Sequence, residues 1–458
     1  MGGALSGWLF ALHALLPQGW RRDVLLEWDA AGDLMAVTDN AAPPNGVEVA
    51  EYVLPGMVNL HSHAFQRALG GMTEVAGDGP DSFWTWRDLM YRFARHITPE
   101  QMEAIAAQLF AECLRHGYTA VCEFHYLQRD AAGALYARPA ETAERVLAAA
   151  RSSGIGLTML PVLYSHAGFG AQPLKLEQAR FRTDADDVLR IVEALAPQRG
   201  GQVEVGFAPH SLRAAGVAQI REVAQALPAG RPIHIHIAEQ QGEVRQCLDY
   251  CGRRPVQYLY DQVGVDARWC LVHATHVQPD EVALMAASGA VAGLCPTTEA
   301  NLGDGLFPLA EFIAAGGHFG VGSDSHVSQS PVEELRWLEY GQRLQRQQRN
   351  VAATADERRV GDYLWQAALQ GGAQAAGRKL GVLAPGCRAD LLVLDDAHVN
   401  LCGVAIADVL GSVLFCGNDN LVRDVLCGGQ WQVRDGRHVA QDAIATAYKR
   451  TLAQLRAL

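Results

Sequence analysis

The sequence predicts an α/β protein in which a (β/α)8 barrel carries a small β-sandwich domain formed by both chain ends. Eight short apolar runs rich in β-branched residues alternate with longer helical patterns, which is typical of a parallel sheet with crossover helices. Eight such units are the number that closes a barrel. The two ends of the chain show strand and turn patterns without intervening helices, so they are expected to pair with each other.

The predicted barrel strands follow one another along the chain at residues 53–63, 118–126, 156–166, 203–211, 231–239, 269–276, 290–302 and 318–326. A helix between the first two strands has marked boundaries, with Thr98 as N-cap, Pro99 at the first helical position and Gly117 after the last turn. These signals place a crossover helix between the first two strands.

Four segments follow from this pattern. The barrel is expected over 55–384, and the small β domain is expected to combine 1–54 with 385–440. The first of these flanks contains DAAGDLMAV, and the second contains CRADLLVLD and VLCGGQWQVRDGRHV, all strand and turn patterns. Residues 441–458 are expected to form a C-terminal helix.

Composition excludes several classes of protein. The chain has 458 residues, 49% hydrophobic and 19% charged, as expected of a soluble globular protein with a large core. A formal net charge of -12, with no basic run, argues against nucleic-acid or membrane-surface partners. Ten cysteines without a CxxC pair suggest reduced thiols and a cytoplasmic protein. We expect no signal peptide and no membrane span, which needs about 20 apolar residues.

Histidines concentrate where the predicted strands end, which is the end of a barrel at which active sites are built. Ten of the 16 histidines lie there: His61, His63, His125, His166, His210, His234, His236, His273, His276 and His326. A pair such as His61 and His63 shares one strand face, although alone it could equally be a surface pair. His234 and His236 also share a face, and the strand period does not decide which of the two would reach a metal. His166, His276 and His326 are expected to be loop residues.

Imidazole and carboxylate together favour zinc and related ions, and catalytic sites of this kind leave one position for water. His61, His63, either His234 or His236, and Asp324 would supply such a set. Because a bound ion lowers the pKa of water toward about 7, these residues predict a metal-dependent hydrolase.

The strand-end motifs HSH, HIAE, VHATH and GSDSH resemble those of the amidohydrolase superfamily. Five longer segments are similar to the formimidoylglutamate (N-formimino-L-glutamate) deiminases, a family of histidine degradation: PGMVNLHSHAFQRALGG, DSFWTWRDLMY, TAVCEFHYL, FAPHSLRA and IHIHIAEQ. The similarity covers nearly the whole chain. The four strand-end motifs are shared by many deaminases, whereas FWTWRD, FHY and PHSLR are specific.

This resemblance implies a role for each matching residue. It makes His61, His63, His236 and Asp324 the metal ligands, with Glu239, His273 and Asp324 catalytic. It assigns substrate binding to Gln66, Arg87, Tyr126, His210 and Arg213. It also implies a cytoplasmic homodimer that binds a small dicarboxylate. The chain has only three lysines, Lys175, Lys379 and Lys449, and all lie outside the predicted strand ends. With no bridging lysine available, one divalent ion per chain, zinc above all, is expected.

The implied reaction is hydrolysis of N-formimino-L-glutamate to N-formyl-L-glutamate and ammonia. Asp324 would accept a proton from the attacking water, and His273 would stabilise the charge that develops. Glu239 would pass a proton to the leaving nitrogen. Arg87 and Arg213 would bind the two substrate carboxylates through charge-assisted hydrogen bonds.

Alternatives remain at this point. Another deaminase of the superfamily, acting on a nucleobase, nucleoside or triazine, would share the metal ligands, but it would not need two arginines. A scaffold protein that has lost catalysis would lack some of the metal ligands and catalytic residues. Glu239 could be a solvated carboxylate at the rim, and Arg87 could pack against Trp84 or Trp86.

Overall fold

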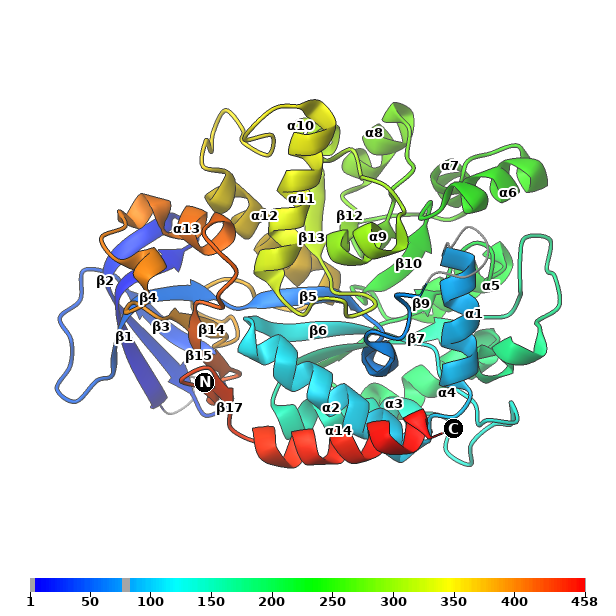
Figure 1. The fold of residues 1–458 in the computed structure, drawn as a ribbon, viewed down its shortest axis with the longest axis horizontal. Coiled ribbons are helices and arrows are strands. Elements are labelled where there is room, and N and C mark those ends of the chain that lie inside the picture. The colour runs from blue at the N-terminus through cyan, green and yellow to red at the C-terminus, as the bar shows by residue number, and fades with distance from the viewer. Residues whose placement is uncertain (1–4, 76–82, 458) are drawn as a thin grey trace.

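The computed structural model describes residues 5–75 and 83–457. Its centre is a barrel of parallel strands, with the helices of the crossovers around it (Figure 1). The strands are β5 (Met57–Ser62), β6 (Tyr118–His125), β7 (Gly156–Leu163), β8 (Val203–Val205) with β9 (Ala208–Pro209), β10 (Ile233–Ile237), β11 (Trp269–His273), β12 (Val291–Leu294) and β13 (His318–Val321). The predicted barrel is confirmed.

The barrel consists of two groups of strands that meet at two bridges. One group runs β5-β6-β7-β8, with β9 paired to β7, and the other runs β10-β11-β12-β13. A parallel bridge between Ser62 and Asp324 joins the end of β5 to the segment after β13, and a bridge between Phe207 and Ile233 joins the groups on the other side. The first bridge therefore closes the barrel at residues next to or within the predicted metal site.

Both chain ends build a second sheet, as predicted. Its order is β17-β16-β15-β14-β4-β1-β2-β3, and it lies beside the barrel at the left of Figure 1. The N-terminal strands are β1 (Leu5–Leu16), β2 (Gly19–Asp29), β3 (Leu34–Thr38) and β4 (Val49–Pro55), and the C-terminal strands are β14 (Leu391–Leu394), β15 (Val422–Cys427), β16 (Gln430–Arg434) and β17 (Arg437–His438). The antiparallel pairing of β4 with β14 joins the two ends.

The first predicted strand, 53–63, divides in two at Gly56. Residues up to Pro55 belong to the sheet of the chain ends, and the barrel strand begins at Met57. A Cβ at Gly56 would lie 2.2 Å from Thr119 Oγ1, so only glycine fits where the chain passes from one sheet to the other.

The crossover helices are α1 (Phe83–Ala94), α2 (Pro99–Arg115), α3 (Glu141–Ser153), α4 (Ala185–Leu195), α5 (Val217–Ala226), α6 (Gln241–Cys251), α7 (Pro255–Gln262), α8 (Pro279–Ser288), α9 (Pro296–Leu302), α10 (Leu309–Ala314), α11 (Pro331–Arg346) and α12 (Val360–Ala376); α13 (Val409–Phe415) and α14 (Gln441–Arg456) follow them. Thr98 caps α2 as predicted, because its side chain accepts from Gln101 N and the side chain of Gln101 bonds back to Thr98 N. α14 runs along α2 beneath the barrel (Figure 1).

Within the described ranges 5–75 and 83–457, no helix combines the length and the apolar character needed to cross a bilayer.

Candidate metal centre and active site

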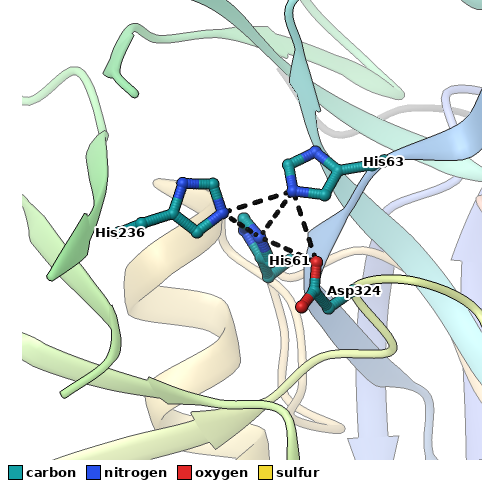
Figure 2. Close-up of side chains that lie close together, drawn as sticks. All are labelled: His61, His63, His236 and Asp324. Atoms are coloured by element: carbon teal, nitrogen blue, oxygen red, sulfur yellow. Dashed lines mark hydrogen bonds and ion pairs between the residues drawn. The ribbon is translucent and has the colours of Figure 1, made fainter. Parts of the chain in front are cut away.

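Four side chains converge at the ends of β5 and β10 and in the segment that follows β13 (Figure 2). The Nε2 atoms of His61, His63 and His236 lie 3.0–3.2 Å from one another. Asp324 Oδ1 lies 3.4 Å from His61 Nε2 and 3.3 Å from His63 Nε2. Four ligands held tetrahedrally about 2.0–2.1 Å from one ion would be roughly 3.3–3.4 Å apart. The spacing of the four side chains thus fits a small divalent cation.

Hydrogen bonds at the far side of two rings determine which nitrogens face the centre. His63 Nδ1 donates to Phe124 O and His236 Nδ1 donates to His210 O, each at 2.9 Å. Both Nε2 atoms therefore present lone pairs to the same point, as in metal sites. Burial and the neighbouring imidazoles hold the pKa of His236 well below its usual value, so the ring is neutral. A cation at that point would make this arrangement of lone pairs favourable, and the residues present fit one.

The backbone at the site is unusual for residues other than glycine. Ala238, His273 and Asp324 have φ of +51°, +67° and +44°, in the left-handed region that L-residues seldom occupy. Asp324 N donates to His61 O at 3.0 Å, and His63 N donates to Asp324 O at 3.3 Å. Such strain persists where surrounding contacts enforce it, and it clusters at functional sites.

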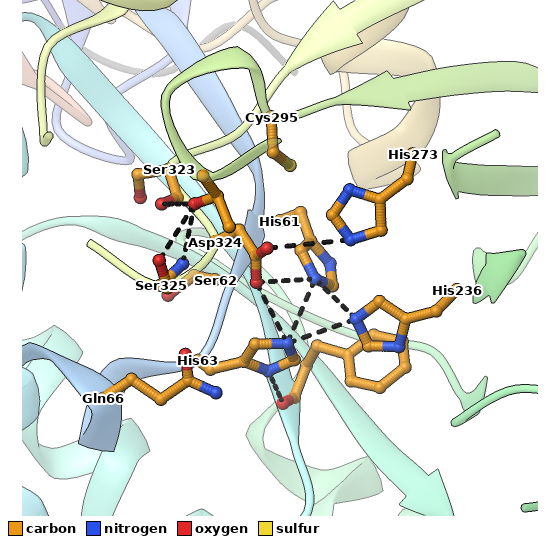
Figure 3. A network of polar contacts seen from close by, with 12 residues as sticks. His61, Ser62, His63, Gln66, His236, His273, Cys295, Ser323, Asp324 and Ser325 are labelled. Carbon is orange, nitrogen blue, oxygen red and sulfur yellow. Dashed lines mark hydrogen bonds and ion pairs between the residues drawn. The ribbon is translucent and has the colours of Figure 1, made fainter. Parts of the chain in front are cut away.

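His273 lies among three carboxylates, and Figure 3 shows the contact with one of them, Asp324. Its Nε2 is 3.6 Å from Asp324 Oδ2 and 3.8 Å from Glu239 Oε1, while its Nδ1 is 3.2 Å from Glu299 Oε1. Burial lowers the pKa of His273, but the carboxylates outweigh it and raise the pKa to about 10. The ring is consequently an imidazolium that connects carboxylates on both of its edges.

Glu239 is a buried carboxyl, not a solvated one at the rim. The residue is 4% exposed, and burial raises its pKa to about 7 against the opposing charge of His273. A group with that pKa can both accept and give up a proton near neutral pH. Its backbone N–H donates to Glu243 Oε2 at 3.1 Å, which orients the segment after β10.

One pocket contains all the predicted site residues except His61, which is fully buried. Its walls hold the two predicted arginines, on α1 and after β9, and the predicted neutral groups. The members of this predicted set are His63, Gln66, Arg87, Tyr126, His210, Arg213, His236, Glu239, His273 and Asp324. The structure therefore brings together residues that are separated by more than 250 positions in the sequence.

The arginines lie on the side of the pocket formed by aromatic residues. The guanidinium of Arg87 stands over the ring of Tyr91, 5.4 Å from its centroid. Burial raises the pKa of Tyr164 well above its usual value, and the charges of Arg213 and Arg87 oppose that rise, which places both charges near one phenol. Trp86 lines the same pocket. The alternative packing of Arg87 on Trp84 lies outside the described side chains.

Neutral groups line the pocket next to the metal cluster, because the ring of Tyr126 lies beside His63 and that of His210 beside His236. Gln66 Nε2 donates to Tyr126 OH at 2.8 Å. The ring of His210 makes edge contacts with Tyr126 and Tyr164, with centroids 5.6 and 4.7 Å apart. These groups can donate or accept hydrogen bonds without adding charge.

Other strand-end histidines lie outside this pocket. His234 Nε2 donates to Ala375 O at 2.8 Å, and His125 Nε2 bonds Thr142 Oγ1 at 2.9 Å. His326 lies in a turn after β13, as expected of a loop residue, and there it is buried and bonds Ser323 Oγ at 3.0 Å. Sequence reasoning missed Tyr91, Tyr164 and Glu299. Tyr164 ends a predicted strand and could have been noticed there, whereas Glu299 lay within a run interpreted as strand, where it had no distinguishing signal.

Comparisons with known proteins agree with this geometry. Residues 52–432 match the sequence profile described as Amidohydrolase family. The chain is 53% identical over 448 residues, 98% of this chain and 99% of the relative, to formimidoylglutamate deiminase of Pseudomonas aeruginosa. It is 29% identical over 419 residues, 90% of this chain and 88% of the relative, to 5-methylthioadenosine/S-adenosylhomocysteine deaminase of Natronomonas pharaonis.

A solved structure shares the whole architecture. The crystal structure of an amidohydrolase from Brucella melitensis superimposes with a TM-score of 0.93 at 43% sequence identity, covering 98% of this chain and 100% of that one. The barrel and the sheet of the chain ends thus form one conserved arrangement in the two proteins.

Proposed function

Because this chain belongs to the amidohydrolase family, we propose that it hydrolyses N-formimino-L-glutamate to N-formyl-L-glutamate and ammonia in histidine degradation. Water adds its oxygen to the formimino carbon, the bond from that carbon to the terminal nitrogen breaks, and both protons of the water end on that nitrogen. The observation that carries the proposal is a single pocket that joins a metal-type cluster to two arginines.

His61, His63, His236 and Asp324 would hold the metal, which we propose to be one zinc ion per chain. A divalent ion bound there acts as a Lewis acid that lowers the pKa of water toward about 7. Three imidazoles and one carboxylate are the types of ligand that zinc prefers. None of the residues lining the pocket is a lysine, which favours one ion over a bridged pair.

Proton transfer would then pass between three neighbouring groups. Asp324 accepts a proton from the attacking water, and the imidazolium of His273, 3.6 Å from Asp324 Oδ2, stabilises the negative charge that develops. Glu239, 3.8 Å from the same ring nitrogen, gives a proton to the departing nitrogen. This step is necessary because ammonia is a far better leaving group than amide ion.

Substrate recognition falls to the arginine side of the pocket. Arg87 and Arg213 would each bind one of the two carboxylates, and a hydrogen bond to a charged group contributes about 1.5–3 kcal/mol. Gln66, Tyr126 and His210 would orient the uncharged part of the substrate. Because the protein carries a net charge of -12 and charges are screened beyond about 8 Å, affinity for a dianion must come from such short contacts.

A nucleoside or triazine deaminase would share the metal ligands but not the need for two guanidinium groups. The test is to incubate the zinc-loaded protein with N-formimino-L-glutamate, and separately with 5-methylthioadenosine, and to measure ammonia. We expect ammonia from the first compound only. Efficient release from the nucleoside alone would reject the proposal and favour the other activity.

A further inference from the structure

Glu299 contacts the edge of His273 that faces away from the pocket. His273 Nδ1 donates to Glu299 Oε1 at 3.2 Å, while Nε2 at the opposite edge faces Asp324 and Glu239. Glu299 is 5% exposed and is not among the residues that line the pocket. Its direct contact with the residues that line the pocket is therefore the one with the imidazole of His273.

The carboxylate of Glu299 is itself firmly held. It lies in α9, and its Oε1 also accepts the backbone N–H of Cys295 at 2.9 Å, directly before that helix. His273 needs such support, because its backbone lies in the left-handed region with φ of +67° and the end of β11 does not by itself determine the direction of the ring.

We propose that Glu299 is a positioning residue for His273: its hydrogen bond to Nδ1 holds the ring so that Nε2 faces the two carboxylates that move protons. This inference rests on the proposed function, since it assigns Glu299 to the same proton-transfer step. A buried carboxylate bonded to the far nitrogen of an imidazole is a recurring way to orient that ring.

A rival interpretation is that His273, Cys295 and Glu299 hold a second metal ion, because their donor atoms lie within 4.8 Å of one another. The hydrogen bond between Nδ1 and Glu299 Oε1 disfavours it, because it already engages two of the three donor atoms.

The test compares Glu299→Gln with a matched control, Glu334→Gln. Glu334 is likewise a fully buried glutamate that supports α9, accepting Thr297 N at 2.9 Å and Thr297 Oγ1 at 2.5 Å, but it does not contact His273. Zinc per chain, the thermal midpoint, kcat and KM for N-formimino-L-glutamate are measured for the wild type and both variants.

We expect Glu299→Gln to lower kcat by about 10- to 100-fold, the usual effect of losing an orienting partner, with zinc content unchanged. KM should stay within about threefold of the wild type because the arginines are untouched. Glu334→Gln should keep kcat near the wild-type value.

Three results would overturn the inference: wild-type kcat in Glu299→Gln, equal losses of kcat in both variants, or loss of one zinc ion from Glu299→Gln alone. The last result would support the second metal site. Failure of the proposed function looks different, since the wild type itself would then release no ammonia although it carries zinc. In that case the zinc contents of the variants still distinguish a positioning role from ligation.

Discussion

His234 and His236 show that the position of a histidine along a strand determines whether its side chain reaches the metal cluster. They share a face of β10, as the period of two requires, yet only His236 reaches the metal cluster. His234 bonds the carbonyl of Ala375 in the last turn of α12, and Thr158 on β7 bonds the next carbonyl, that of Ala376. Both residues thus attach barrel strands to α12. Periodicity predicts the face of a side chain, but its depth in the barrel depends on strand tilt and on distant packing.

The buried position of Glu239 beside His273 leads to a prediction about turnover. Glu239→Gln keeps the size of the side chain but removes its ability to transfer a proton, so turnover should fall by about 10²- to 10⁴-fold. Zinc content and the circular dichroism spectrum should match the wild type, because Glu239 is not among the four ligands. Steady-state kinetics of the purified variant provide the measurement, and near-normal turnover would remove Glu239 from the mechanism.

Arg213, 7% exposed, gives a second prediction at this scale. In Arg213→Met, a substrate carboxylate would be desolvated but would have no guanidinium to bind. The loss in kcat/KM should therefore correspond to about 2–5 kcal/mol, with zinc content unchanged. Arg221→Met is a suitable control, because Arg221 lies on α5 and bonds Gln262.

Formiminoglycine should be a poor substrate for the wild type, since it lacks one carboxylate. If the wild type used it as well as formiminoglutamate, the assignment of two arginines to two carboxylates would be wrong.

At the scale of elements, the order of strands and helices could be predicted from the sequence, because each apolar run and each cap is a local signal. Thr98 and Pro99 marked the start of α2 correctly. Two boundaries could not be predicted. The run 53–63 divides at Gly56 because two sheets meet there, and 290–302 turns into α9 at Pro296. Glu299 consequently had no visible partner in the sequence, since its contact with His273 depends on that turn.

The close contact between the segment that follows β13 and β5 leads to a prediction about the position of β5. A Cβ on Gly322 would lie 2.7 Å from His61 N and 2.9 Å from His61 O, so Gly322→Ala must displace the strand that carries two metal ligands. Overpacking of this kind costs about 1–3 kcal/mol. We expect a lower thermal midpoint and less zinc per chain.

Gly264→Ala is the control for that experiment, because a Cβ at Gly264 would meet nothing within 4 Å. Full zinc content in Gly322→Ala would show that the two strands can separate without disturbing the ligands.

At the scale of the whole molecule, the metal would connect the two groups of barrel strands. His61 lies in β5 and His63 directly follows it, whereas His236 lies in β10 and Asp324 follows β13. Removal of zinc by a chelator should lower the thermal midpoint, because an ion that binds only the folded state stabilises it. Elemental analysis should give one zinc per active chain. Two ions per active chain, or an unchanged midpoint after zinc removal, would contradict this arrangement.

The identity of the nitrogen product tests the central claim most directly. Zinc-loaded protein is supplied with N-formimino-L-glutamate, and the products are identified by mass spectrometry together with an ammonia assay. The proposed mechanism predicts equal amounts of ammonia and N-formyl-L-glutamate, because Glu239 delivers a proton to the terminal nitrogen. Formamide with glutamate would mean that the bond on the other side of the formimino carbon breaks, and it would contradict the proposed deimination.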